Sequence, residues 1–582
     1  MQFYKTKREK LEVLRAQLIN ERQSFIPHWR EIGEYVSPRR PRFLTSDVNK
    51  GDARNSKIID STATLAARTQ RAGMMSGVTS PARPWFRLTT PDPNLSEDNA
   101  VKQWLYLVTQ RMSTVFLQSN IYNSLPVVYG DMGTFGTSAL LIEEDDEYVF
   151  RSYPFPIGSY MIATDHRLKV NTFMREFRMT VRQLIEKFGK RNAQTGEIDW
   201  SNFSTYVKNQ YEQGQLEAWV DVVHAIVPNT DYNPKKLESK FKKYSSCYYE
   251  QGSLGSAGNY MVQEQDTYLR ESGYDYFPVL CPRWETTGED AYATSCPGMD
   301  SLGDNKGLQT LQKRKAQAIE KMVNPPMTGP SALKAVKTSI LPGDITYSDE
   351  REGVKGFRPV HEVDPKIREL LLDIQDHQQR IKRAYFEDLF LMMSATDRRE
   401  ITAREVDERH EEKLLALGPV LEQLNQDLLD PLIDIVFALM LKQGLIPPAP
   451  DDLQGFPLIV EYVSIMASAQ KLIAVSGVER FASFSEQLAA NNPGIRHKIN
   501  YDNMLDVYGD LTSIPAGIVR TDEEAEQIRA QLQKQMQAQQ TAENIPGAAS
   551  AVKQLSETNL EDDSALKRVL DRARAGQAVE TN

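Results

Sequence analysis

Hydrophobic residues recur at helical spacing in the central part of the chain. From about residue 300 to residue 322 they return at intervals near three, four and seven, at Leu308, Leu311, Ala318, Ile319 and Met322. Asn324-Pro325-Pro326 should end this helix, because proline lacks a backbone donor and restricts the residue before it. The pattern predicts one long amphipathic helix with a defined end.

A segment rich in glycine and proline, residues 327–363, follows this helix. Gly329-Pro330 and Pro342-Gly343 punctuate short β-like runs such as Ile345-Thr346-Tyr347. Turn residues that alternate with short apolar runs predict a small mixed module.

A second long helix is predicted to begin at Asp364, an N-cap acceptor, with Pro365 at the first helical position. Its apolar face continues for roughly 27 residues, which corresponds to about 40 Å at about 1.5 Å per residue. The residues on this face are Ile367, Leu370, Leu371, Ile374, Ile381 and Tyr385.

A polar loop and a third helix come next. Thr402-Ala403-Arg404-Glu405 has the spacing of a capping box, in which the two side chains satisfy opposite backbone amides. The helix can continue to Leu441, with bends or breaks expected at Pro419 and Pro431. The order of helix, module, helix, loop and helix is typical of a shaft with something folded at its tip.

The N-terminal half mixes helices with strands. Residues 6–36 are predicted to be helical, and a helix rich in small residues is predicted at 60–77. Strands are predicted at 139–142, 159–163, 170–178, 217–227, 243–250 and 277–284, and a helix at 181–188 capped by Thr180 and Gln183. The fold class is therefore α+β and mainly helical.

The C-terminal part begins with a linker, Pro447-Pro448-Ala449-Pro450, and a predicted strand at 458–463. Thr521-Asp522-Glu523-Glu524 is a further capping box, ahead of a glutamine-rich helix at 525–540. From Thr541 onward aromatic residues are few, so this tail is predicted to be disordered or partner-dependent.

Composition narrows the possible functions. A chain of 582 residues can form several domains, and its net charge of −10 argues against tight binding of nucleic acid over a basic surface. Cys247, Cys281 and Cys296 lack the spacing of a metal site or a disulfide framework and are predicted to be buried thiols. The longest apolar run, 432–441, has about half of the roughly 20 residues that span a bilayer, and no secretory signal is evident.

Motifs for catalysis are absent from the sequence. The glycines of residues 130–137 resemble a phosphate loop but lack its lysine, so a turn that leads into the strand 139–142 is expected. The acidic run 143–147 is read as a solvated hairpin turn rather than a cation site, because it lacks EF-hand spacing. Seven histidines, His28, His166, His224, His361, His377, His410 and His497, form no metal or nucleophile motif, and each is predicted to be structural rather than catalytic.

Basic residues cluster on the two long helices. They are Lys306, Lys313, Arg314, Lys315 and Lys321 on the first helix, and Arg380, Lys382 and Arg383 on the second. Such residues can form a solvated face, ion pairs between neighbouring subunits, or a DNA-facing stripe. The basic loop 37–42 is likewise a linker or a nucleic-acid contact.

A series of short motifs gives a more specific indication. They include Asp60-Ser61-Thr62-Ala63, Met74-Met75-Ser76-Gly77-Val78-Thr79-Ser80-Pro81, Trp85-Phe86, Phe135-Gly136-Thr137, Pro282-Arg283-Trp284, Thr402-Ala403-Arg404-Glu405, Leu417-Gly418-Pro419-Val420 and Tyr462-Val463-Ser464. Each motif is short and weak evidence by itself, but the order and spacing of all the motifs together are specific. On these residues the chain resembles the portal, or head-to-tail connector, proteins of short-tailed, podovirus-type bacteriophages, over most of its length.

The resemblance implies the phage portal fold, assembled as a ring, typically of twelve subunits, around a central channel. It divides the chain into an N-terminal α+β wing region (1–295), a first stem helix (296–326), a clip (327–363), a second stem helix (364–391), a channel loop (392–401), a long wing helix (402–445), a crown (446–545) and a flexible C-terminal tail (546–582). Twelve copies would carry a charge of −120 (12 × −10), and a largely acidic conduit would let DNA slide.

The resemblance also implies candidate contact residues. In the channel loop these are Ser394, Ala395, Thr396, Asp397, Arg398, Arg399 and Glu400, whose mixed charges suit contact with DNA without trapping it. An ordinary exposed connection would explain the loop equally well. In the clip, Lys334, Lys337, Asp344 and Tyr347 are the candidates for docking a partner.

The implied function is that of a non-enzymatic portal at the unique capsid vertex of the virion, assembled in the host cytoplasm. It would nucleate procapsid assembly, dock the large terminase subunit, pass double-stranded DNA during packaging and ejection, and attach the tail through an adaptor or head-completion protein. Major capsid and scaffolding proteins would be further partners, and no cofactor, metal or membrane is expected. The alternatives are a tail, adaptor or scaffold protein without a channel, or a DNA-packaging enzyme, against which the missing Walker motif argues.

Overall fold

The computed structural model describes most of the first 463 residues and short stretches beyond them. The described residues are 6–44, 51–92, 95, 98–191, 196–251, 267–335, 338–339, 344–347, 356–360, 367–394, 417–453, 457–463, 481–485, 487–488, 500–501, 504–505, 508, 525, 528–534 and 536. The chain divides into two compact units, Met1–Ile473 and Ala474–Asn582. In the second unit, residues 481–485 and 528–534 are helical. The second of these helices falls in the predicted glutamine-rich helix, whereas its capping box at 521–524 and the tail from 541 lie outside the described residues.

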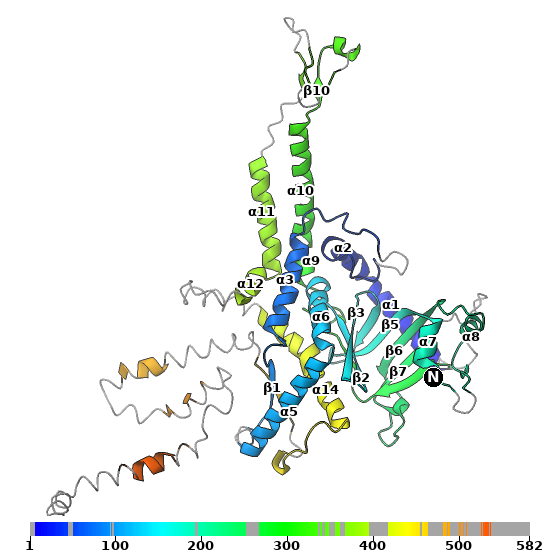
Figure 1. Ribbon diagram of the computed structural model, residues 1–582, viewed down its shortest axis with the longest axis vertical. Helices are drawn as coiled ribbons and strands as arrows, with labels where there is room; N and C mark the ends of the chain where they lie inside the picture. Colours follow the sequence, from blue (N-terminus) through cyan, green and yellow to red (C-terminus); the bar gives the residue numbers. More distant parts are fainter. Residues whose placement is uncertain are drawn as a thin grey trace, which may run out of the picture. The chain divides into compact units, whose positions relative to one another are not determined.

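The two larger sheets of the first unit are both antiparallel (Figure 1). The larger sheet has the strand order β4-β5-β6-β7-β8, and the smaller has the order β3-β2-β9. The strands are β2 (Ala139–Asp145), β3 (Val149–Phe155), β4 (Tyr160–Thr164), β5 (Val170–Thr180), β6 (Trp219–Pro228), β7 (Tyr244–Glu250), β8 (Arg270–Tyr274) and β9 (Val279–Leu280).

Most of the predicted strands are confirmed. The segment predicted at 277–284 forms only the two-residue strand β9, and β8 has no predicted counterpart. Strand β8 lies at the edge of its sheet and reads Arg-Glu-Ser-Gly-Tyr, so it lacks the apolar alternation that marks a half-buried strand. The acidic run 143–147 extends strand β2 to Asp145 before the chain turns, so the hairpin turn is shorter than predicted.

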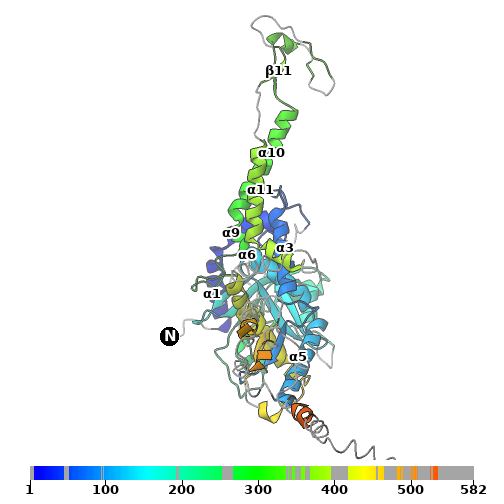
Figure 2. The same ribbon diagram turned by 90° about the vertical axis from the view of Figure 1, so that its left-hand side faces the viewer.

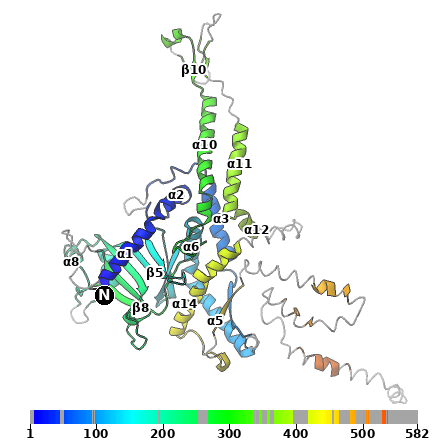
Figure 3. The ribbon, with the colours of Figure 1, turned by 180° about the vertical axis from the view of Figure 1, so that it is seen from behind.

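Helix α1 (Lys7–Gln23) covers one face of the larger sheet, as Figure 3 shows from behind. Leu11 and Leu18 are buried there against Met174, Val223 and other sheet residues. The helical prediction for 6–36 is confirmed, although the chain turns after Gln23 and resumes as α2 (Ile26–Val36).

The opposite face of the larger sheet packs against α7 (Val181–Phe188) and α8 (Thr205–Glu212). Val222 belongs to this cluster while the next residue, Val223, faces α1, because successive side chains of a strand alternate between faces. Thr180 and Gln183 form the predicted capping box of α7.

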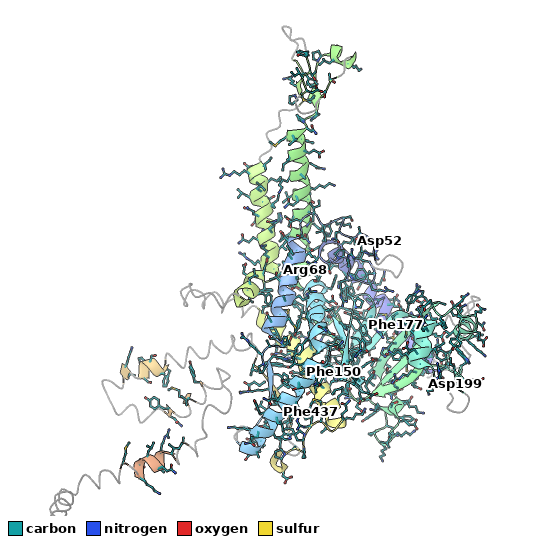
Figure 4. The ribbon with its side chains drawn as sticks, viewed as in Figure 1. Asp52, Arg68, Phe150, Phe177, Asp199 and Phe437 are labelled. Carbon is teal, nitrogen blue, oxygen red and sulfur yellow. The ribbon has the colours of Figure 1, made fainter. Side chains whose placement is uncertain are left out.

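A second layer of the unit is helical. It contains α3 (Thr62–Gly77), α5 (Asn99–Gln118), α6 (Ile121–Phe135) and a two-stranded sheet of β1 (Phe86–Thr89) with β12 (Ile459–Tyr462). The predicted strand at 458–463 is therefore confirmed. Phe150 of β3 belongs to the core that these elements share with the smaller sheet, and partly buried Phe437 packs against this core; both residues are marked in Figure 4.

The turn predicted at 130–137 is wrong for most of this segment. Residues 130–135 continue helix α6, and only Gly136, with φ of 83°, makes the turn into β2. The glycines serve close helix packing instead: a Cβ on Gly133 would lie 2.1 Å from Oε1 of Gln70 on α3.

The third predicted helix is described from residue 417 onward, so its capping box at 402–405 lies outside the described residues. The chain remains helical across Pro419, forms a π-helical turn at Asn425–Leu429, and continues as α14 (Asp430–Lys442). The irregular turn comes directly before Pro431, where a bend was predicted, and a π turn is a common way for a helix to accommodate such a residue.

Two long helices lie side by side in the first unit, α10 (Leu302–Val323) and α11 (Ile367–Ala384), as Figures 1 and 2 show. The short helix α9 (Pro297–Asp300) precedes α10, and α12 (Glu387–Ser394) follows α11. Between the long helices, β10 (Met327–Thr328) pairs with β11 (Arg358–Pro359). The 3-10 turns are Ser239–Phe241, Ser331–Ala335 and Asp451–Leu453.

The buried state of the three cysteines is confirmed, and none of the three forms a disulfide. Within the described ranges, no helix combines the length and apolar character that a membrane span requires.

Candidate functional site

The helix pair α10 and α11 is anchored at its base by a buried polar network. Gln309 of α10 is buried, and its Oε1 accepts hydrogen bonds from the backbone amides of Ile59 and Asp60, both at 2.7 Å. Its Nε2 donates to the Asp60 carbonyl at 3.0 Å and to Oδ1 of Asn305 at 2.8 Å. Asn305 in turn donates to the carbonyl of Tyr35 at 3.2 Å. One turn of α10 is thereby fixed to two other segments of the chain.

Asp60 connects three helices. Its Oδ1 accepts from the backbone amide of Thr62 at 2.8 Å, at the N-terminal end of α3 where a negative charge is stabilised. Its Oδ2 accepts from Gln312 of α10 and from Gln378 of α11, each at 2.8 Å. Partial burial alone would raise the pKa of Asp60, but the hydrogen bonds from Thr62, Gln378 and Gln312 outweigh it and lower the pKa.

The lowered pKa of Asp60 predicts a loss of stability in acid. Its contribution is present above the unfolded value of about 3.9 and is lost as the pH falls through the lower folded value. We expect Asp60→Asn to flatten the dependence of unfolding free energy on pH in this range, as measured by urea unfolding at a series of pH values. Asp52→Asn, at the exposed site marked in Figure 4, should leave the dependence unchanged. Equal slopes in the two variants would contradict the assigned role of Asp60.

The two helices pack against each other in their inner halves. Leu308, Ile374 and Ile381 are buried in one cluster, with Leu311 and Leu370 partly buried beside them. A Cβ on Gly307 would lie 3.1 Å from Cε1 of His377, so the helices approach closely at this level. Nδ1 of His377 lies 2.9 Å from Oδ1 of Asp304. The prediction that His377 is structural agrees with this position.

The second helix is shorter than predicted. A single helix was expected through about residue 390, but α11 ends at Ala384 and Phe386 has a φ of 54°. Tyr385 is buried at this break, and α12 starts one residue after Phe386. The break lets α12 pack closely on α3, where a Cβ on Gly73 would meet Cδ1 of Phe390 at 2.2 Å. The predicted start at Asp364-Pro365 lies outside the described residues.

The outer half of the helix pair has exposed apolar side chains. Met322 is 52% exposed and Leu372 is 60% exposed, and Ile319, Val323 and Leu371 are also exposed. By the helical repeat, Ile319 and Met322 continue the face of α10 that is buried further in, whereas Leu372 lies on the side of α11 away from Ile374. Nothing in the described part of the chain covers them.

The segment between the helices is only partly the mixed module that was predicted. Its described strands are β10 and β11, which are two residues long, whereas 344–347 is not a strand. Thr346 instead donates from its Oγ1 to the carbonyl of Ser339 at 3.1 Å. Of the candidate docking residues, Lys334, Asp344 and Tyr347 are exposed, and Lys337 lies outside the described residues.

The basic residues of the helix pair fall into two groups. Lys306 pairs with Glu31, Lys382 with Glu387 at 3.7 Å, and Arg380 with Asp376 at 2.6 Å. The second group forms no ion pair among the described residues, and it consists of Lys313, Arg314, Lys315, Lys321 and Arg383. Ser394 ends α12, whereas Ala395, Thr396, Asp397, Arg398, Arg399 and Glu400 lie outside the described residues.

Two ion pairs with buried carboxylates were not predicted from the sequence. Arg40, from the basic loop 37–42, pairs with buried Asp131 at 2.6 Å, so this residue of the loop is structural. Arg283 pairs with Asp427 of the π-helical turn through two hydrogen bonds, at 3.0 and 3.2 Å. Each pair joins residues far apart in sequence. Of these four residues, only Arg283 belongs to one of the short motifs on which the family resemblance rests.

Comparison with known protein families matches residues 8–519 to the family described as bacteriophage head to tail connecting protein. The chain therefore belongs to this family of phage connector proteins. It is 46% identical to the portal protein of Salmonella phage epsilon15, over 98% of this chain and 99% of that protein. It is also 40% identical to the probable portal protein of Bordetella phage BPP-1, over 95% of this chain and 96% of the other. The resemblance to podovirus portal proteins is thereby confirmed.

Proposed function

We propose that copies of this chain assemble into the portal ring at one vertex of a phage capsid, around a channel through which DNA enters and leaves. In this proposal α10 and α11 form the stem, and residues 327–363, which include β10 and β11, form the clip at its outer end. Residues 392–401 form the channel loop, and the sheets with helices α1 to α8 form the wing. The ring has twelve subunits by the family resemblance, and its place is in the virion, after assembly in the host cytoplasm.

The observation that carries the proposal is the exposed apolar outer half of the helix pair. Two helices alone cannot cover each other on all sides, and several exposed large apolar side chains on one element are typical of an interaction site. A ring of stems would cover the exposed side chains of Ile319, Met322 and Leu372 with neighbouring subunits. The membership of the connector family supports the same assembly.

The remaining roles follow from the positions of the parts in such a ring. The clip docks the large terminase subunit during packaging and a tail adaptor afterwards, with Lys334, Lys337, Asp344 and Tyr347 as the candidate contacts. The wing meets the major capsid and scaffolding proteins, and the ring nucleates the procapsid. DNA passes without sequence recognition, which suits the net charge of −10 per subunit.

Electron microscopy of the purified protein tests the assembly directly. We expect annular particles of fixed symmetry with a central hole. A protein that stays monomeric at micromolar concentration would contradict the proposed function.

Replacement of residues 327–363 by a short flexible linker tests the role of the clip. We expect rings to form and the far-ultraviolet circular dichroism of the wing to persist, because the packed contacts of α10 and α11 lie in their inner halves. Binding of the large terminase subunit, measured by co-sedimentation with the rings, should be lost. Retained binding would show that the terminase docks elsewhere. The substitution Tyr347→Ser in the intact clip serves as a milder comparison, because it changes one exposed side chain without changing the charge.

A further inference from the structure

Four residues stand side by side across the larger sheet, on the face that packs against α7. Arg175 of β5 lies opposite His224 of β6, and His224 lies opposite Tyr248 of β7. Tyr248 in turn lies opposite Arg270 of β8. Directly opposite residues of an antiparallel pair share a face, with about 5 Å between their Cβ atoms. The imidazole of His224 stacks on the ring of Tyr248, with ring centroids 3.7 Å apart. Two arginines therefore flank a stacked histidine and tyrosine.

A lysine from the last turn of α7 brings a third cation to this row. Nζ of Lys187 lies 5.1 Å from the ring centroid of Tyr248. His224 is fully buried beside that ring. Burial lowers the pKa of the imidazole well below its ordinary value, and so do the three cations, in the order Arg175, Lys187 and Arg270. The three cations thus act on one point of the sheet.

The guanidinium of Arg175 has hydrogen-bonding capacity that the described structure does not use. Its carbon lies 4.4 Å from the ring centroid of Phe155 and 4.0 Å from that of Phe177, which is labelled in Figure 4. Neither ring offers a strong hydrogen-bond acceptor. Nε of Arg175 and Nδ1 of His224 have no hydrogen-bond partner among the described residues. Buried polar atoms normally have a partner, so a ligand group at this point would supply what is missing.

One carboxylate faces the three cations. Glu143 of β2 accepts a hydrogen bond from the hydroxyl of Tyr248 at 3.3 Å. None of the three cations forms an ion pair within the part of the chain that the structure describes. Three cations and one carboxylate leave a local charge of +2.

The neighbouring acidic residues in the chain do not offset this charge. Glu271 follows Arg270 in β8, so it points to the opposite face of the sheet, where it pairs with Lys7 at 2.6 Å. Glu186 precedes Lys187 in α7, and adjacent positions of a helix do not face each other.

We infer that Arg175, Lys187 and Arg270 form an anion site that binds a doubly charged oxyanion of the phosphate class. A phosphate group carries about −1.5 to −2 near pH 7 and balances the local charge, whereas a single carboxylate would leave an excess of cations. Charges withdrawn from water are stabilised by a partner of opposite sign, and arginine and lysine both bind phosphate oxygens through charge-assisted hydrogen bonds. The phosphate is either free or part of a nucleic acid. The anion site goes beyond the proposed ring and does not depend on it.

Isothermal titration calorimetry of the full-length protein with inorganic phosphate, at constant ionic strength, tests the anion site. We expect saturable binding at one site per subunit. A rim variant, Lys187→Gln with Arg270→Gln, removes the two exposed cations. It should weaken phosphate binding by at least about tenfold, because each cation contributes a charge-assisted hydrogen bond.

Glu143→Gln provides a change in the opposite direction. It removes the one carboxylate of the anion site, which repels phosphate, so inorganic phosphate should bind at least about threefold more tightly. A purely structural role of these side chains would not produce opposite effects in the two variants. Unchanged or weaker binding by Glu143→Gln would contradict the anion site, and this result decides even if the rim variant loses its circular dichroism spectrum.

A matched control removes one lysine and one arginine elsewhere. Lys10→Gln with Arg30→Gln changes two exposed residues, on α1 and α2, and alters the net charge by the same amount as the rim variant. It should leave phosphate binding unchanged. Equal weakening in the control and the rim variant, or no saturable binding by the folded wild type, would overturn the anion site and leave the proposed function intact.

A short DNA duplex identifies the source of the phosphate. If the group belongs to DNA, the duplex should compete with inorganic phosphate and lose affinity in the rim variant. If free phosphate is the ligand, the duplex should not compete, while phosphate binding still depends on Lys187 and Arg270. An acidic peptide that binds the wild type when inorganic phosphate does not would overturn the assigned class of ligand.

Discussion

An Arg283→Ala variant is expected to lose about 3–5 kcal/mol of unfolding free energy, because it leaves the carboxylate of Asp427 largely buried without its cation. Both side chains are almost fully covered, and the guanidinium also donates to the carbonyl of Leu168 at 3.0 Å. The pair connects the segment after β9 to the π-helical turn before α14. The shift of the urea midpoint at constant m value measures the loss.

The control for this prediction is an ion pair of similar length at the surface. Arg178 and Asp221 lie 2.7 Å apart on neighbouring strands and are each about half exposed, so Arg178→Ala should cost below about 1 kcal/mol. Arg283→Met combined with Asp427→Leu should recover part of the loss, since it removes both charges together. Equal losses of unfolding free energy for Arg178→Ala and Arg283→Ala would show that burial does not strengthen the Arg283–Asp427 pair.

Local patterns predicted the long elements of this fold well. Helices α10 and α11 follow the spacing of their apolar residues, and the capping box at Thr180 marks the start of α7. These signals are local because both periodicity and capping depend on residues within a few positions of each other.

Features that depend on close approach between distant segments escaped prediction. Residues 130–135 looked like a turn because of their glycines, yet Gly133 serves the contact of α6 with Gln70. The break at Phe386 has no proline or glycine to mark it, and the packing of Phe390 on Gly73 explains it only once the structure is known.

The candidate site was predictable to a similar degree. Its charges were visible in the sequence, but their directions were not, since the face toward Asp60 is defined by Gln309, Gln312 and Gln378. Uncharged polar residues on an otherwise amphipathic helix give only a weak signal. Once these three residues fix the inner side of the helix pair, the directions of the other side chains follow from the helical repeat.

Gly298→Ala is the second change with a large expected effect. Gly298 lies in α9, directly before α10, and a Cβ there would lie 2.1 Å from the backbone oxygen of Thr134 and 2.8 Å from its carbonyl carbon. The obstacle is the backbone of α6 rather than a flexible side chain, so α9 must move. We expect a loss of about 3 kcal/mol, at the upper end of the cost of overpacking, measured by urea unfolding.

Gly303, five residues further along, provides the matched control. It lies in α10 with no atom within 4 Å of its added Cβ, so Gly303→Ala should be neutral or should stabilise the protein by about 0.4–1 kcal/mol. The contrast isolates the contact between α9 and α6, because both changes add one methyl group near the base of α10. If the proposed stem is positioned through this contact, Gly298→Ala should also reduce the fraction of subunits in rings, while Gly303→Ala should not. Identical stability of the two variants would contradict the close approach of α9 to α6.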